Sequence, residues 1–193
     1  MANESTSVDK SGRRVRAMFA SIAGKYDPVV GADFCREMLV IGRQKVKKAD
    51  AESRITLVEG DTQRLPAPSD TFGVVTVAFG LRNVADTAKG IDEMIRVAKP
   101  GGRVAMLEFS KPRVPILRGL YMFFFKKILP TVGQTVAPNQ HEAYSYLPQS
   151  VLEFPDGQAM LDLLTARGLL EARQYSLTLG IASLYVGVKP ALR

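Results

Sequence analysis

Polar side chains that could bind a ligand or move a proton fall at the ends of four predicted buried strands. Asp33 follows the first strand, Asp61 the second, Arg82 and Asn83 the third, and Glu108 closes the fourth. In open α/β sheets ligands bind beyond the carboxyl ends of the strands, so these positions are informative. Each residue alone is equally well explained as a helix cap, a turn residue or a surface charge. Four such positions in succession favour a binding site.

The two aspartates have the chemistry of an adenosine site. A carboxylate such as Asp33 accepts hydrogen bonds from the vicinal hydroxyls of a ribose. Asp61 and the backbone amide after it suit the exocyclic amine and ring nitrogens of adenine. A fold that binds a nucleoside in this way normally has a strand and a glycine-rich turn before the acid, and neither precedes Asp33 in this sequence.

The elements that must position these residues alternate between strand and helix. Apolar runs predict buried strands at residues 29–32, 55–58, 74–79 and 103–109. Apolar residues at helical spacing predict a helix over 38–46 and another from the cap residue Asp86 to Ala98. Pro100-Gly101-Gly102 is the predicted turn before the fourth strand. The alternation predicts an α/β fold, a doubly wound sheet with right-handed crossovers.

The two ends of the chain add a helix each and a hairpin. The N-terminal 27 residues contain a short amphipathic pattern that stops at Gly24, and a helix near residues 160–164 ends at Gly168. Two β-rich runs, 172–178 and 182–188, predict an antiparallel hairpin at the sheet edge. A length of 193 residues predicts a single domain.

Residues 117–129 carry a stripe of large apolar side chains with basic residues beside it. The simplest explanation is a helix packed on the sheet. The alternative is a lid over an apolar substrate or a basic amphipathic surface that meets a membrane, which Met122 and Phe123, outside the stripe, favour. We divide the predicted domain into a cap helix (1–27), a cofactor half (28–109), a substrate lid (110–150) and a C-terminal helix with hairpin (151–193).

Composition and charge exclude several classes of protein. The 26 Lys and Arg against 19 Asp and Glu give a net charge of +7, but the basic residues are scattered, without the aromatic-interleaved stripe of a nucleic-acid-binding surface. Cys35 is the one cysteine, so an internal disulfide is excluded and a reducing cytoplasm is expected. Cys35 and His141 cannot form a zinc site. The sequence lacks a signal peptide and an apolar run of about 18 residues, which predicts a cytoplasmic protein.

Longer motifs resemble a known family. From about Val15 to Lys189 the sequence is similar to the ubiquinone/menaquinone biosynthesis C-methyltransferases, in the segments MFASIAGKYD, VVGADFCREML, LVEGDTQRLPAP, VVTVAFGLRNVAD, RVAKPGGRVAMLEFS and AYSYLPQSV. The resemblance implies a Rossmann-like class I methyltransferase sheet. It also implies transfer of a methyl group from S-adenosyl-L-methionine to a ring carbon of a prenylated quinol, either a demethylmenaquinol or a polyprenyl benzoquinol.

The resemblance gives each cofactor residue a role. Asp33 would bind the ribose and methionyl end of S-adenosylmethionine, and Asp61 with Thr62 would hold the adenine. Ala78 stands where the family often has a small polar residue that touches the cofactor.

The resemblance also places two residues beside the substrate. Arg82 and Asn83 would orient the quinol or activate a water that removes its phenolic proton. The apolar stripe of 117–129 would cover the isoprenoid tail, which is compatible with peripheral contact with a membrane. The sequence is also compatible with either a monomer or a homodimer.

One departure from the family is large. Between Asp27 and Pro28 the family has a further block that includes the first strand, its glycine-rich turn and the next helix, about 30 residues or more. Two hypotheses therefore stay open. The chain is either a methyltransferase that works with the remaining half-site or with a partner, or a truncated, non-catalytic remnant that keeps at most a lipid-binding or interaction surface.

Overall fold

The computed structural model describes residues 28–113 and 149–191, together with Gly119, Tyr121, Phe123 and Tyr146. The predicted cap helix in 1–27, most of the predicted lid and His141 lie outside the described residues. The chain divides into two compact units, Met1–Glu59 and Gly60–Arg193. The single domain predicted from length stays a prediction, and each unit is described by itself.

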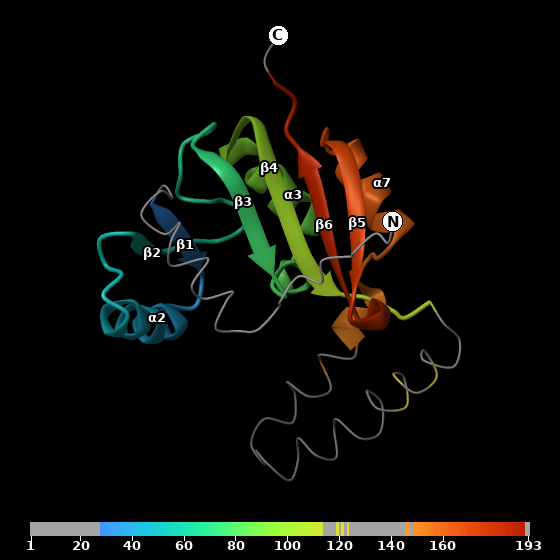
Figure 1. Ribbon diagram of the computed structural model, residues 1–193, viewed down its shortest axis with the longest axis horizontal. Helices are drawn as coiled ribbons and strands as arrows, with labels where there is room; N and C mark the ends of the chain where they lie inside the picture. The colour runs from blue at the N-terminus through green and yellow to red at the C-terminus, as the bar shows by residue number, and fades with distance from the viewer. Residues whose placement is uncertain are drawn as a thin grey trace, which may run out of the picture. The chain divides into compact units, whose positions relative to one another are not determined.

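The first unit contains a parallel strand pair and one helix (Figure 1). Strand β1 (Val29–Asp33) pairs in register with β2 (Ile55–Glu59), and helix α2 (Arg36–Lys48) connects them. Both strands and the helix lie where they were predicted, although Asp33 is the last residue of β1 instead of the residue after it. The predicted burial of the two strands is wrong, because this two-stranded pair is half-buried to exposed along its whole length. The helix buries Leu39 against the strand pair, while β1 leaves Val29 54% exposed.

The second unit is a four-stranded sheet in the order β3-β4-β6-β5 (Figure 1). The strands are β3 (Phe72–Ala78), β4 (Ala98–Phe109), β5 (Leu170–Leu177) and β6 (Ala182–Val188). Strands β3 and β4 are parallel, and β6 is antiparallel to both β4 and β5. The predicted C-terminal hairpin is confirmed, with the short 3-10 turn η4 (Thr178–Gly180) between its strands.

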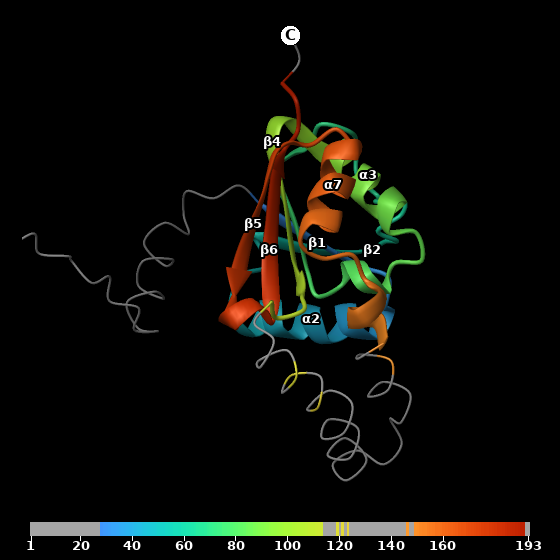
Figure 2. The ribbon, with the colours of Figure 1, turned by 90° about the vertical axis from the view of Figure 1, so that its right-hand side faces the viewer.

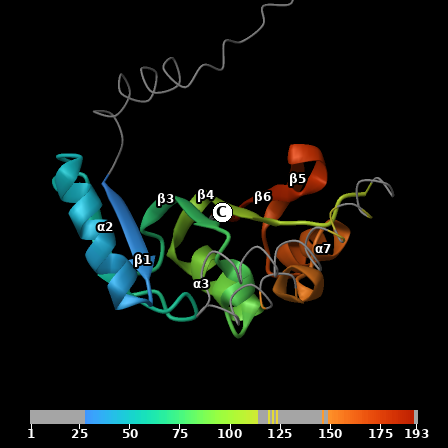
Figure 3. The same cartoon turned by 90° about the horizontal axis from the view of Figure 1, so that it is seen from below.

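Helices α3 (Thr87–Val97) and α7 (Gln158–Ala166) cover one face of this sheet, as Figures 2 and 3 show. Asp86 caps α3 as predicted, because its carboxylate accepts a hydrogen bond from the Lys89 backbone N–H at 3.0 Å. Between helices and sheet lies the main core, which includes Leu81, Ile91, Met94, Val104, Met106, Met160, Leu164 and Tyr185. Alternate residues of the strands point to the opposite face.

The start of β4 corrects one prediction. Ala98, predicted to end the helix, is extended (φ −70°, ψ 141°) and begins the strand, and Pro100-Gly101-Gly102 lies inside β4. The pairing explains how: Ala98 pairs with Phe72 and Arg103 with Val74, so β4 advances five residues while β3 advances two. The predicted turn is therefore an irregularity in the ladder, absorbed at Gly101, whose φ is +74°.

A pair of glycines in this irregularity gives a matched test of packing. A Cβ on Gly102 would lie 2.7 Å from the Lys99 carbonyl oxygen and 3.1 Å from the Gly73 carbonyl oxygen, whereas a Cβ on Gly73 would meet nothing within 4 Å. We expect Gly102→Ala to lower the free energy of unfolding by about 1–3 kcal/mol. Gly73→Ala should change it by less than about 0.5 kcal/mol. Chemical denaturation of both variants checks this; equal effects would contradict the register.

Each unit has a strand with a single partner among the described strands. In the first unit β1 pairs only with β2, and in the second β3 pairs only with β4. On β3, Val74 is 60% exposed, and on β5, Tyr175 is 49% and Leu177 40% exposed. The second unit therefore presents an open strand edge and apolar side chains on the face away from α3 and α7.

Candidate functional site

Asp61 organises the turn that begins the loop between β2 and β3. Its Oδ1 accepts a hydrogen bond from the Gln63 backbone N–H at 2.8 Å, and its carbonyl oxygen accepts one from the Arg64 N–H at 2.9 Å. Asp61 is exposed and Thr62 half-buried. The Gln63 side-chain amide makes long contacts of 3.4 Å with both carboxylate oxygens. The carboxylate therefore builds the turn mainly through Oδ1 and is exposed to solvent, where a ligand could reach it.

Gly90 on α3 is where this loop meets the segment after β3. A Cβ at Gly90 would lie 3.4 Å from both Thr62 Cγ2 and Val84 Cγ1, and 3.5 Å from Leu81 Cδ1. The loop is also bonded directly, since the Asp86 backbone N–H donates to Gln63 Oε1 at 3.2 Å. The structure thus brings the predicted residues Asp61 and Thr62 next to the short helix η2 (Leu81–Asn83), which carries Arg82 and Asn83.

Arg82 is held by a buried ion pair with Glu108. Its Nη1 donates to Glu108 Oε2 at 2.9 Å, and its backbone N–H donates to Glu108 Oε1 at 3.3 Å. The same Nη1 also donates to the carbonyl oxygen of Phe79. The side chain of Glu108 is 1% exposed and that of Arg82 10%. Within the described part of the chain, Arg82 Nε is buried without a hydrogen-bond partner. The guanidinium is therefore fixed in place, and one of its donors is uncommitted.

Aromatic rings surround this cation. The Arg82 guanidinium carbon lies 5.2 Å from the centroid of the Phe109 ring, which packs at 4.6 Å against Phe79. Tyr121 packs near Phe109 in a second buried cluster. Burial raises the pKa of the Tyr121 hydroxyl to about 12, although the charge of Arg82 acts in the opposite direction. Tyr121 is consequently a neutral phenol at physiological pH, able to donate a hydrogen bond but unsuited to act as a base.

A pocket of about 290 Å³ opens beside Arg82. Its lining mixes polar and apolar side chains, namely Arg82, Thr87, Tyr146, Gln149, Ser150, Glu153, Phe154 and Pro155. A cavity of about 150 Å³ is enough for benzene, so this volume suits one substituted ring or a small fused ring system. All of these residues belong to the second unit, and the cation stands at the wall of the pocket.

The positions of the other three predicted site residues, Asp33, Ala78 and Asn83, do not test their predicted roles. Asp33 ends β1 in the first unit, opposite Glu59 in the ladder, and its Oδ1 accepts a hydrogen bond from the Cys35 N–H at 2.8 Å. Ala78 ends β3 and is exposed. Asn83 is exposed, and its backbone N–H donates to the Gly80 carbonyl oxygen at 3.0 Å. The roles of all three residues stay predictions.

Asp33 and Asp61 supply acceptors of the kind that the adenosine half of S-adenosylmethionine needs. Each accepts a local backbone N–H through Oδ1, and the Gln63 side-chain amide lies 3.4 Å from both oxygens of Asp61. Carboxylates accept from ribose hydroxyls or the adenine amine. In the described residues no glycine-rich turn follows a strand, since Gly101 and Gly102 lie inside β4. The same residues contain no cluster of three His, Cys, Asp or Glu side chains that could hold a metal, and no helix long and apolar enough to cross a bilayer.

The role of Glu108 and the pocket were missed by the sequence analysis. Glu108 was noted only as a strand-end residue, yet Val104 and Met106 lie on the same buried face of β4. A carboxylate in that register requires a cation partner, and Arg82 follows the neighbouring strand, so the alternation could have identified the pair. The lining residues between 149 and 155 had no comparable signal.

Comparison with known protein families and curated proteins shows which sequences this chain is similar to. The profile of the ubiE/COQ5 methyltransferase family matches residues 9–189. A ubiquinone/menaquinone biosynthesis C-methyltransferase UbiE of Geobacter sp. (strain M21) is 44% identical over 161 residues, 83% of this chain and 68% of that protein. A demethylmenaquinone methyltransferase of Shouchella clausii (strain KSM-K16) is 41% identical over 167 residues, 86% of this chain and 70% of that protein.

A solved structure has the same fold. A SAM-dependent methyltransferase from Aquifex aeolicus aligns with a TM-score of 0.61 at 16% identity, covering 90% of this chain and 74% of that one. The predicted α/β class, a mostly parallel sheet with a C-terminal antiparallel hairpin, is confirmed.

Proposed function

This chain belongs to the ubiE/COQ5 methyltransferase family, and from that premise we propose that it transfers a methyl group from S-adenosylmethionine to a ring carbon of a prenylated quinol. The observation that carries the proposal is the fixed cation at the wall of a ring-sized pocket: Arg82 is bonded to the buried Glu108 and lines the 290 Å³ space. The two relatives described above carry quinone-pathway names, which supports this substrate class.

The family resemblance gives each proposed cofactor residue a role. Asp33 would accept hydrogen bonds from the ribose, and Asp61 with Thr62 would hold the adenine, with Ala78 at the end of β3 in contact with the cofactor. The exposed carboxylate of Asp61, whose Oδ2 accepts only a long 3.4 Å contact from the Gln63 side chain among the described residues, supports the role of Asp61. When bound, S-adenosylmethionine supplies a methyl group on a sulfonium, whose departure needs no acid.

The chemistry then depends on the quinol oxygen. A quinol ring carbon becomes strongly nucleophilic as the hydroxyl beside it loses its proton. A guanidinium stays protonated at physiological pH, so Arg82 is not a base itself. Its fixed positive charge would instead stabilise the developing phenolate, as preorganised charges do in a partly dry site. Asn83, the next residue, would orient the quinol or the water that takes the proton.

The bonds balance without a further reactant. S-adenosylmethionine would supply the methyl group and leave as S-adenosylhomocysteine, while the ring carbon would lose its hydrogen as a proton to water. The phenolic oxygen would regain the proton that it gave up, so one proton is released in net. Glu108 has no part in the proton transfer, because both of its oxygens are engaged by Arg82. Its role is to hold the guanidinium against the aromatic wall.

The ring, not the tail, is what the pocket recognises. A volume of 290 Å³ accommodates the quinol head but not a polyprenyl chain. The resemblance implies that the apolar residues of 117–129 cover the tail, and of these the described Phe123 is 56% exposed. Because prenylated quinols reside in the bilayer, the basic chain (net charge +7) would approach an anionic membrane surface to reach them.

A specific observation favours a second candidate. The described residues lack a glycine-rich turn after a strand, and β1 and β3 each have one partner. A glycine-rich turn normally lets the backbone come close to the methionine portion of the cofactor, so another segment would have to bind that portion. On this alternative the chain is a non-catalytic relative that keeps a lipid-binding or interaction surface.

Binding of S-adenosylhomocysteine separates the two candidates. We expect the product to raise the thermal midpoint, because saturation at 100 times the Kd stabilises the native state by about 2.7 kcal/mol. Asp33→Ala and Asp61→Ala should each weaken binding by about 10- to 100-fold, since each removes a charged hydrogen-bond acceptor. Asp162→Ala, which removes an exposed carboxylate of α7, is the control. A wild-type midpoint that ignores the ligand would favour the non-catalytic alternative.

Methyl transfer itself is tested with labelled cofactor. The purified chain is incubated with methyl-labelled S-adenosylmethionine and short-tailed benzoquinol or naphthoquinol, and label is sought in the extracted quinol. Ring-methylated product from either quinol supports the proposal and identifies the head group. Cofactor binding without product from both would contradict it.

A further inference from the structure

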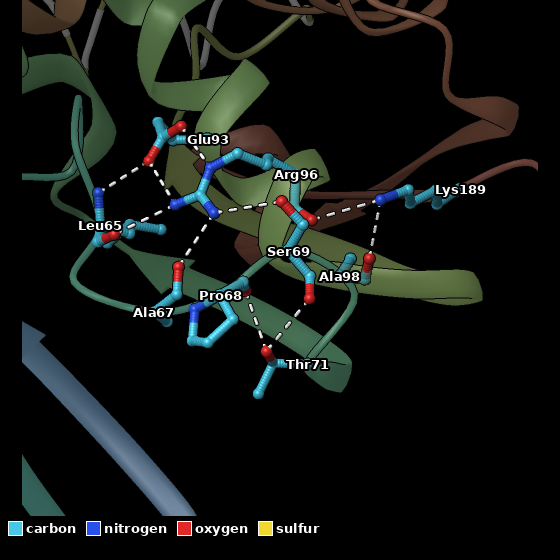
Figure 4. A network of polar contacts seen from close by, with 9 residues as sticks. All are labelled: Leu65, Ala67, Pro68, Ser69, Thr71, Glu93, Arg96, Ala98 and Lys189. Carbon is cyan, nitrogen blue, oxygen red and sulfur yellow. Dashed lines mark hydrogen bonds and ion pairs between the residues drawn. The ribbon is translucent and has the colours of Figure 1, made fainter.

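The loop that carries Asp61 and Thr62 has almost no ladder of its own. In residues 60–71 the one strand-like pairing is the bridge between Asp61 and Arg64. Backbone N–H and C=O groups in such a segment still need partners. Two side chains on the last turns of α3, Glu93 and Arg96, supply several of them (Figure 4).

The planar guanidinium of Arg96 donates hydrogen bonds to two backbone carbonyl groups of the loop. Its Nη2 donates to the Leu65 carbonyl oxygen at 3.0 Å, and its Nη1 donates to the Ala67 carbonyl oxygen at 2.9 Å. A weaker contact of 3.4 Å joins Nη1 to Ser69 Oγ. Figure 4 shows the guanidinium between α3 and the loop, with the two carbonyl groups turned toward it.

Glu93 completes the arrangement from one turn earlier. Its Oε2 accepts a hydrogen bond from the Leu65 N–H at 2.8 Å, so Leu65 is bonded through both its N–H and its C=O. The same carboxylate pairs with Arg96 at 2.6 Å (Oε1 to Nε) and 2.8 Å (Oε2 to Nη2). The hydrogen bonds from Arg96 lower the pKa of Glu93, and the bonded carboxylate raises the pKa of Arg96. Both groups are charged at neutral pH.

The far end of the loop is fixed separately. The Asp70 and Thr71 N–H groups donate to the Arg96 and Val97 carbonyl oxygens at 3.0 and 2.9 Å. Lys189 Nζ donates to the Ala98 carbonyl oxygen at 2.9 Å and also binds Asp70. These contacts do not involve the Arg96 guanidinium, so the end of the loop at β3 would persist without it, while its middle would not.

We infer that Glu93 and Arg96 are positioning residues that fix the Asp61–Thr62 segment for the adenosine end of the cofactor. This rests on the proposed function, in which Asp61 and Thr62 hold the adenine. The hydrogen-bonded turn from Asp61 to Arg64 ends one residue before Leu65, where both side chains bind. Loss of the clamp at Leu65 leaves that turn with the weaker 3.2 Å bond from the Asp86 N–H to Gln63 Oε1 as its described polar tether to the start of α3. The turn then samples other conformations, and the affinity for the cofactor falls with the fraction of molecules in the competent one.

The test uses variants that keep the chain folded. Arg96→Lys keeps the charge but cannot bind two carbonyl groups in one plane, and Glu93→Gln keeps an acceptor for Leu65 but loses the paired charge. The matched control is Arg167→Lys, which changes another ion pair of α3, the 3.0 Å contact between Arg167 and Asp92, without touching the loop. Circular dichroism and the unfolding midpoint verify that all three variants fold.

Two readouts are compared in the full chain. Calorimetry measures the Kd for S-adenosylhomocysteine, and hydrogen exchange measures the Gln63 and Arg64 amides, whose acceptors are both in Asp61. We expect Arg96→Lys and Glu93→Gln to accelerate exchange at these amides, with exchange in β4 unchanged, and to weaken binding about tenfold if the competent conformation falls to about one tenth. The control should change neither.

The outcomes distinguish the inference from the function on which it rests. If the wild-type chain binds no S-adenosylhomocysteine, the proposed function fails, yet faster exchange in the variants would still support the clamp. Unchanged exchange at Gln63 and Arg64 in both variants would overturn the inference, whatever the chain binds. Faster exchange with an unchanged Kd would overturn its second half, the link to the cofactor.

Discussion

Arg82→Lys is expected to lower methyl transfer by about 10²- to 10³-fold while leaving the Kd for S-adenosylhomocysteine within about twofold. Lysine keeps a positive charge beside the buried Glu108, so the ion pair and the fold survive. Its compact ammonium group lacks the planar shape with which the guanidinium of Arg82 is fixed between Glu108 and the Phe79 carbonyl group, so the charge is no longer held at one place on the pocket wall.

Steady-state rates with saturating cofactor and quinol, together with calorimetric binding, check this expectation. Arg103→Lys, at an exposed position of β4, is the control and should retain full turnover. Unchanged turnover in Arg82→Lys would mean that residue 82 serves only as a countercharge to Glu108. Alanine at position 82 is a less clean test, because it also leaves the carboxylate buried and unpaired.

Glu108→Leu should have the largest effect on stability. The substitution leaves the guanidinium of Arg82 buried without its carboxylate, and removing one partner of a buried pair costs about 3–5 kcal/mol. That is a large part of the margin of about 5–15 kcal/mol that keeps a typical domain folded. The double variant Arg82→Met with Glu108→Leu should regain most of the loss, since two apolar side chains of similar size replace both charges.

Unfolding of the wild-type chain, the single variant and the double variant in guanidinium chloride gives their free energies of unfolding. Recovered stability without recovered methyl transfer in the double variant would separate the structural role of the pair from its chemical role. A single variant as stable as the wild-type chain would mean that water solvates the Arg82 guanidinium in place of Glu108.

Much of the local structure follows from sequence because short-range rules govern it. Asp86 is a strong N-cap by residue type, and the structure confirms the bond it makes. The hairpin from Leu170 to Val188 follows from two β-rich runs and a short connection. The start of β4 was missed because Pro100-Gly101-Gly102 is typical of a turn, while pairing with β3 holds these residues in a strand.

The site was only partly predictable, for a related reason. Strand ends indicated Asp61, Arg82 and Asn83, because the topology of a parallel sheet gathers them. The bond between Arg82 and Glu108 joins residues 26 positions apart, and the bonds from Arg96 to the loop span 29 and 31 positions. No periodicity in a single sequence reports such pairs. The buried register of Glu108 was the one usable signal.

The open edge of β3 has a consequence for how this protein behaves in concentrated solution. Among the strands that the structure describes, β3 pairs with β4 alone, and such an edge can accept another extended chain, with the exposed Val74 as an apolar contact at the same place. Mutual repulsion between molecules that each carry a charge of +7 opposes such contacts. Salt shortens the range of that repulsion to about 10 Å at 0.1 M. The colloidal stability of the chain therefore depends on its basic surplus, and self-association should grow as ionic strength rises.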